Sequence, residues 1–134
     1  MTQTILFVED DETDRLFLKL SLDETGLGLN ASYCEDGLQA LEYLKSNDAP
    51  DLIVTDLSMP GMDGLELTQT LKSDEAYSII PVLMLSTSNS KIDVRRFYSK
   101  SGNAYIRKPE SPEGYQRVLS EISRFWFEVA ERGV

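Results

Sequence analysis

The feature that most constrains the fold is the regular alternation of five short apolar runs with segments of helical periodicity. Such short runs, apolar throughout, are typical of strands buried on both faces of a parallel sheet. The expected strands cover residues 5–8, 29–34, 51–56, 79–85 and 104–106. The expected helices cover 13–25, a segment that opens at Asp36, 65–72, 90–101 and 112–132. This order predicts an α/β fold, with a doubly wound five-stranded parallel sheet and five helices on its two faces.

Two of the expected helices carry more apolar surface than one buried face requires. The last helix has an inward stripe at three- and four-residue steps, formed by Tyr115, Val118, Leu119, Ile122, Phe125, Trp126 and Val129. Phe127 falls outside that stripe, so this helix provides either core alone or core and an interface. In the first helix, Leu16 and Leu20 lie opposite the inward face, where they are candidates for a docking surface.

Composition excludes several functional classes. The chain has 134 residues, 41% of them hydrophobic, which suits one domain with one core. Its net charge of −10 makes nucleic acid an improbable partner. A single cysteine, Cys34, fits a reducing compartment, and no apolar run is long enough for a membrane span, so we expect a cytoplasmic protein. The absence of histidine excludes catalytic triads and histidine metal sites.

The stretch DLIVTDLSMPGMDG, residues 51–64, contains the most informative single residue. Asp56 stands at the end of an apolar strand and is followed by a turn around Pro60 and Gly61. A carboxylate at the end of a buried strand is costly unless it is paired, so a cationic group is expected beside it.

Polar residues follow the other strands at matching places. Glu9, Asp10 and Asp11 follow the first strand, Ser86 the fourth and Lys108 the fifth. Because the carboxyl ends of parallel strands share one edge, these side chains should surround one crevice with Asp56. Clustered carboxylates repel unless a cation intervenes, and an all-oxygen donor set suits Mg²⁺. Asp56 would then be a nucleophile toward a phosphoryl group whose charge is offset by the metal and Lys108.

Each of these residues also has a simpler explanation. A second explanation for Asp56 is an aspartate that stabilises a turn or caps a helix. A second explanation for the acids at 9–12 is a helix cap whose negative charge interacts favourably with the helix dipole. Ser86 is equally suited to capping a loop, and Tyr105 to packing as a strand aromatic. The coincidence of Asp56, Lys108 and the acids at matching strand ends favours a shared site.

The motifs together resemble the receiver domain of response regulators, a CheY-like superfamily. The matching pieces, spread over essentially the whole chain, are Val8-Glu9-Asp10, Asp56 followed by MPGMDG, Ser86 after Pro81-Val-Leu-Met-Leu, and Tyr105-Ile-Arg-Lys108-Pro109. The resemblance implies the flavodoxin-like receiver fold with strand order 2-1-3-4-5. It also implies one receiver domain over residues 1–134, without an output domain.

Position by position, the resemblance makes Asp56 the phosphoacceptor that forms an aspartyl phosphate. It implies that Mg²⁺ is held by Glu9, Asp10, Asp56 and the backbone carbonyl of Ser58, with Asp10 the more direct ligand of the acidic pair. Asp11 is a third acid beyond that pair.

The same resemblance assigns Ser86 and Lys108 to the phosphoryl group. Tyr105 corresponds to the aromatic residue whose rotamer reports phosphorylation.

The implied function is signal transduction in a two-component phosphorelay, by a switch rather than an enzyme. The donor is a partner histidine kinase or histidine phosphotransfer protein, and output passes through partner binding, a homodimer or relay. A narrower resemblance, carried by the Leu-Ser-Thr-Ser run and the Phe-Trp pair of the last helix, points to receivers of phytochrome-type kinases. Two alternatives stay open: a Mg²⁺-dependent phosphatase with an aspartyl-phosphate intermediate, and an adaptor that is not phosphorylated.

Overall fold

A computed structural model describes residues 2–133. Five parallel strands form one sheet in the order β2-β1-β3-β4-β5. The strands are β1 (Thr4–Val8), β2 (Asn30–Cys34), β3 (Leu52–Thr55), β4 (Val82–Ser86) and β5 (Ala104–Arg107). The helices are α1 (Glu12–Thr25), α2 (Gly37–Ser46), α3 (Gly64–Lys72), α4 (Lys91–Ser99) and α5 (Pro112–Ser123), the last continued by the π-helix η1 (Arg124–Val129). The predicted fold class, strand order and five-helix count are confirmed.

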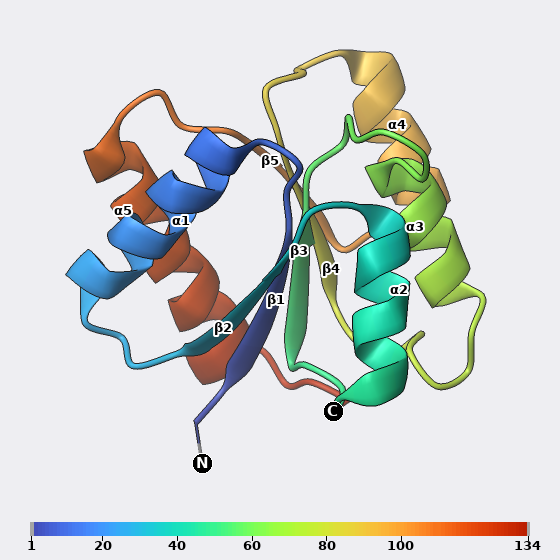
Figure 1. The fold of residues 1–134 in the computed structure, drawn as a ribbon, viewed down its shortest axis with the longest axis horizontal. Coiled ribbons are helices and arrows are strands. Elements are labelled where there is room, and N and C mark those ends of the chain that lie inside the picture. The colour runs from blue at the N-terminus through green and yellow to red at the C-terminus, as the bar shows by residue number, and fades with distance from the viewer. Residues whose placement is uncertain (1, 134) are drawn as a thin grey trace.

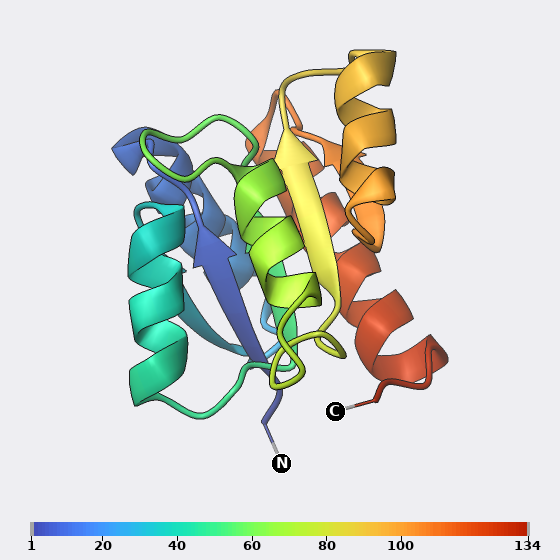
Figure 2. The same cartoon turned by 90° about the vertical axis from the view of Figure 1, so that its right-hand side faces the viewer.

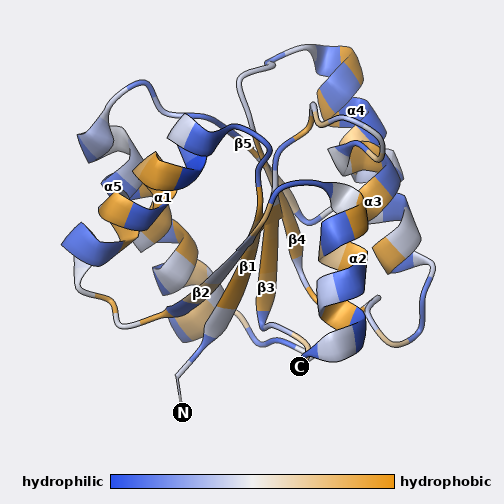
Figure 3. Ribbon diagram, in the orientation of Figure 1, coloured by the Kyte–Doolittle hydropathy of each residue, from blue (hydrophilic) through white to orange (hydrophobic). Residues whose placement is uncertain are grey.

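The helices cover the two faces of the sheet as separate layers (Figure 1). α1 and α5 lie on one face, and α2, α3 and α4 lie on the other. The sheet therefore separates two apolar clusters, one centred on Leu6, Ile53 and Met84 and the other on Phe7 and Val54. Hydropathy follows this layering in part, with mainly apolar strands β1, β3 and β4 inside helices that carry both polar and apolar residues (Figure 3).

Side-chain caps begin four of the five helices where the sequence supplies an acid or a serine. Asp11, Asp36, Asp63 and Ser111 each accept a hydrogen bond from a backbone N–H three residues later. Each cap satisfies one of the N–H groups that a helix start leaves without a partner. The capped helices are the ones that follow β1, β2, β3 and β5.

The expected start of the fourth strand was wrong. β4 begins at Val82, three residues after the predicted start at 79. Ile79 is 55% exposed in a turn that precedes the sheet. Pro81 has no N–H to donate to a neighbouring strand, and only its carbonyl oxygen pairs, accepting from the Ile53 N–H at 3.0 Å.

The expected path of the last helix was also wrong beyond Ser123. There the chain continues as a π-helix, whose wider turn shifts the apolar stripe by about one residue. Phe125 and Val129 are therefore exposed, whereas Phe127 packs with Trp126 against the core. The outward leucines of the first helix, Leu16 and Leu20, are exposed as their positions predicted.

Candidate functional site

Asp56 lies at the carboxyl edge of the sheet, directly after β3. Its backbone N–H donates to the Val8 carbonyl oxygen at 2.8 Å, which ties it to the end of β1. Its Oδ1 accepts from the Leu57 N–H at 2.8 Å, which leaves Oδ2 facing the crevice side chains. A β-carbon at Gly64 would collide with the Asp56 carbonyl oxygen, so the start of α3 packs closely under this residue. The turn and the buried strand together hold one carboxylate oxygen in a defined place.

The loop between β1 and α1 brings the acidic pair to the same edge. Glu9 is 3% exposed, and its N–H donates to the Cys34 carbonyl oxygen at 2.9 Å. Arg15 Nη1 donates to the carbonyl oxygens of Glu9 and Asp10, at 2.8 and 3.0 Å. These bonds fix the backbone on which both carboxylates stand, while Asp10 itself stays exposed to solvent.

Three carboxylates form a group that fits a cation. One oxygen from each of Glu9, Asp10 and Asp56 lies within 4.8 Å of the others. Like charges at this separation repel, and an all-oxygen group of acids is the donor set that Mg²⁺ prefers. Asp11 is outside the group, and its side chain caps α1 through the Asp14 N–H at 3.0 Å. The residues present therefore fit a divalent cation, with Asp11 in a structural role.

Lys108 is the cationic group expected beside Asp56. Its backbone N–H donates to the Ser86 carbonyl oxygen at 2.8 Å, which extends the pairing of β5 with β4. Its Nζ lies 2.6 Å from Glu9 Oε1, 2.8 Å from Asp14 Oδ2 and 3.5 Å from Asp56 Oδ2. The side chain is only 7% exposed, so these ion pairs are shielded from water.

Burial and crowding shift the protonation of this cluster. Burial raises the pKa of Glu9 to about 7, and the nearby Asp56 adds to that effect while Lys108 opposes it. Burial likewise raises the pKa of Asp56, against the opposing charge of Lys108. Burial alone would lower the pKa of Lys108, but its bonds to Asp14 and Glu9 outweigh this effect and raise it. The cluster thus keeps Lys108 charged and disfavours full ionisation of its acids.

Ser86 and Tyr105 are linked through the loop that follows β4. Ser86 is buried, and its Oγ accepts from the Ser88 N–H at 3.1 Å, so its own hydroxyl hydrogen remains available to donate. The Tyr105 hydroxyl donates to the Ser88 carbonyl oxygen at 2.8 Å. The Ser88 hydroxyl donates to Asp93 at 2.6 Å, in the first turn of α4. Ser88 thereby connects Ser86, Tyr105 and α4, and the loop-capping role considered for Ser86 is present.

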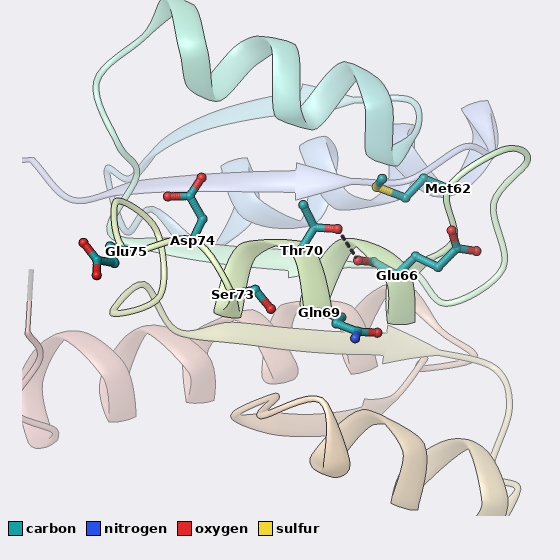
Figure 4. Close-up of a pocket in the computed structure, with 7 residues that line it drawn as sticks. All are labelled: Met62, Glu66, Gln69, Thr70, Ser73, Asp74 and Glu75. Atoms are coloured by element: carbon teal, nitrogen blue, oxygen red, sulfur yellow. Dashed lines mark hydrogen bonds between the residues drawn. The ribbon is translucent and has the colours of Figure 1, made fainter.

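Ser58 lies in a depression beside the acids, which supports its inclusion in the site. This depression, of about 580 Å³, is lined by both Asp10 and Ser58, and also by Asp93 and Arg96 of α4. A second depression of about 770 Å³ runs along α3, where Met62, Glu66 and Asp74 are among its lining residues (Figure 4). The acidic cluster adjoins the first depression, and none of its residues lines the second.

The three-dimensional arrangement adds two residues to those expected from sequence. Asp14 and Arg15 are in α1, one turn beyond the acidic pair, and both reach back to the strand ends. The sequence feature that could have indicated Asp14 is its position as an acid four residues after Asp10. That spacing alone does not distinguish a residue of the site from one that caps a helix. Its partner Lys108 is 94 positions away in the chain.

Several known proteins are similar to this chain in sequence or in fold. A probable methanogenesis regulatory protein, FilR2 from Methanothrix harundinacea, is 34% identical over 127 residues, which cover 91% of this chain and 82% of that protein. The phosphorylated cyanobacterial phytochrome response regulator RcpA has a TM-score of 0.91 and 30% identity, with 100% of each chain covered. The Mn²⁺-bound form of response regulator Rcp1 has a TM-score of 0.86 and 28% identity, covering 98% of this chain and 99% of that one.

A family model matches as well and identifies the family. The response regulator receiver domain model matches residues 5–119, from β1 into α5. That span includes every strand end described above. In the described residues, no helix has the length and apolar character needed to cross a membrane. The chain belongs to the response regulator receiver domain family of two-component signalling systems.

Proposed function

We propose that Asp56 accepts a phosphoryl group from the phosphohistidine of a histidine kinase or histidine phosphotransfer protein, in a Mg²⁺-dependent reaction. The observation that carries this proposal is the pairing of Asp56 Oδ2 with Lys108 at 3.5 Å, beside a three-carboxylate group that fits a cation. The solved relatives, one phosphorylated and one Mn²⁺-bound, support both parts of the proposal.

The chemistry uses the two Asp56 oxygens differently. Oδ1 is held by the Leu57 N–H, and Oδ2 attacks phosphorus as the bond from phosphorus to the donor histidine nitrogen breaks. Lys108 offsets charge on one phosphoryl oxygen, and the free hydroxyl hydrogen of Ser86 is donated to another. Glu9, Asp10, Asp56 and the Ser58 carbonyl would hold the cation, which would supply positive charge beside the transferred group.

Phosphorylation then acts on the loop after β4. The phosphoryl group adds about −1.5 to −2 charges at the crevice and draws the Ser86 hydroxyl toward it. Because Ser88 joins Ser86 to both Tyr105 and Asp93, this movement is passed to β5 and to the first turn of α4. The protein therefore works as a switch with at most self-phosphorylation and self-dephosphorylation, and output passes through a partner, a homodimer or relay.

The kinase partner is proposed to be of the phytochrome type. Both the RcpA structure and a response regulator of red-light signalling in R. palustris align over nearly the full length of this chain, each at a TM-score of 0.91. The same full-length alignment supports a single receiver domain over residues 1–134.

Incubation with Mg²⁺ and acetyl phosphate, followed by intact-mass measurement, tests the reaction without a kinase. We expect one added phosphate in the wild-type protein and none in Asp56→Asn or when Mg²⁺ is chelated. Asp10→Asn removes a carboxylate from the cation site while keeping the acceptor, so it should slow incorporation without abolishing the site. An unchanged mass in the wild-type protein, or a phosphate that persists in Asp56→Asn, contradicts the proposal.

A further inference from the structure

Lys108 has one more close carboxylate than its proposed task requires. Its ammonium group contacts Glu9, Asp14 and Asp56, and the contact with Asp56 is the longest of the three. The side chain is 7% exposed, so the ammonium depends on these carboxylates for its hydrogen bonds. Two of the three partners, Glu9 and Asp56, also belong to the carboxylate group that fits a cation.

Asp14 differs from the other two partners in its location. It comes from the first turn of α1, and its side chain is 29% exposed, against 3% for Glu9 and 11% for Asp56. Its carboxylate is outside the three-carboxylate group. When a cation binds the oxygens of Glu9 and Asp56, their attraction to Lys108 weakens, whereas the 2.8 Å contact with Asp14 is not engaged by that cation.

We propose that Asp14 is a positioning residue that holds the Lys108 ammonium at the crevice and so limits its competition with Mg²⁺ for Glu9 and Asp56. This inference rests on the proposed function, because it assigns Asp14 a task in that same site. Without the Asp14 carboxylate, the close acidic partners of Lys108 are Glu9 and Asp56, which both belong to the group that fits the cation. Loss of Asp14 should therefore weaken Mg²⁺ binding through Lys108.

A simpler role for Asp14 is stabilisation of the start of α1, where acids interact favourably with the helix dipole. Glu12 provides a matched control for that role, since it carries the same charge in the same first turn and is exposed. Both Asp14→Asn and Glu12→Gln remove one negative charge near the site. Only the first removes a partner of Lys108.

The test is calorimetric titration with Mg²⁺ of the full chain as wild type, Asp14→Asn, Glu12→Gln, Lys108→Ala and the double variant Lys108→Ala/Asp14→Asn. We expect Asp14→Asn to raise the Kd for Mg²⁺ by about three- to tenfold more than Glu12→Gln does. In the Lys108→Ala background, Asp14→Asn should have no larger effect than the Glu12 control. Because Asp14 is partly exposed, its substitution should leave the fold intact.

Two results overturn this inference while leaving the proposed function in place. They are an equal effect of Asp14→Asn and Glu12→Gln, and an effect of Asp14→Asn that persists without Lys108. Wild-type protein that neither binds Mg²⁺ nor accepts phosphate would instead contradict the proposed function.

Discussion

At the residue scale, Glu9 and Asp56 show how burial changes the protonation of carboxylates at this site. Both carboxylates are held at strand ends where water is scarce, and burial raises the pKa of each. Lys108 offsets only part of that cost, because one ammonium serves three carboxylates. The metal-free protein is therefore strained electrostatically at the place where a cation is expected to bind.

This strain predicts a pH dependence of the metal-free protein. The folded-state pKa of Glu9 is raised from 4.5 to about 7, so the folded state binds the proton more tightly than the unfolded state does. The free energy of unfolding should therefore fall as pH rises from about 4.5 to 7, by up to about 3 kcal/mol from this group. Urea denaturation at a series of pH values, in the presence of a chelator, measures this change in the free energy of unfolding.

Glu9→Gln is the control for this dependence, because glutamine has no proton to lose in that range. We expect most of the decline between pH 4.5 and 7 to disappear in that variant. A decline of the same size in both proteins would show that other groups are responsible.

At the scale of elements, local sequence signals placed most helix starts but did not reveal where backbone geometry changes. The capping residues Asp36 and Asp63 were recognisable because an acid preceded each helical segment. The π-helix was not recognisable, since residues 112–132 keep a plausible helical period throughout. The switch to wider turns after Ser123 decides that Phe127 faces inward, and nothing in the local residue types signals it.

The inward position of Phe127 makes a prediction that separates the two helix geometries. Phe127 packs against the core and under Arg132, which in turn pairs with Asp51 at 3.0 Å. Phe127→Ala should lower the free energy of unfolding by about 2–3 kcal/mol, and Phe125→Ala, at an exposed site, by about 1 kcal/mol or less. Chemical denaturation of the two variants provides the comparison. Equal losses, or a larger loss for Phe125→Ala, would favour an uninterrupted α-helix.

At the scale of the whole molecule, the sheet topology was predictable from the sequence. The contacts between side chains that are distant in the sequence were predictable only in part. The alternation of strands and helices and the right-handed crossover rule leave few possible sheets, and the observed strand order is the one that the resemblance to receiver domains implied. The strands run parallel, so their carboxyl ends meet at one edge (Figure 2). That rule was enough to bring Asp56, Glu9 and Lys108 together.

Asp14 shows where such reasoning stops. Its approach to Lys108 depends on how α1 is rotated against the sheet, and helix periodicity gives that rotation only to within about a residue. The helix-capping hypothesis for the acids at 9–12 was correct for Asp11, while Glu9 and Asp10 joined Asp56 in the cation-fitting group. One acidic run therefore divides between two roles that its sequence alone does not separate.

The most direct test of the account identifies the residue that carries phosphate. After incubation with Mg²⁺ and acetyl phosphate, borohydride reduction converts an aspartyl phosphate to homoserine, which peptide mass spectrometry locates. We predict homoserine at position 56 and at no other position. Homoserine at position 10 or 11, or an acid-stable phosphate on Ser86 without any homoserine, would contradict the central claim that Asp56 is the phosphoacceptor.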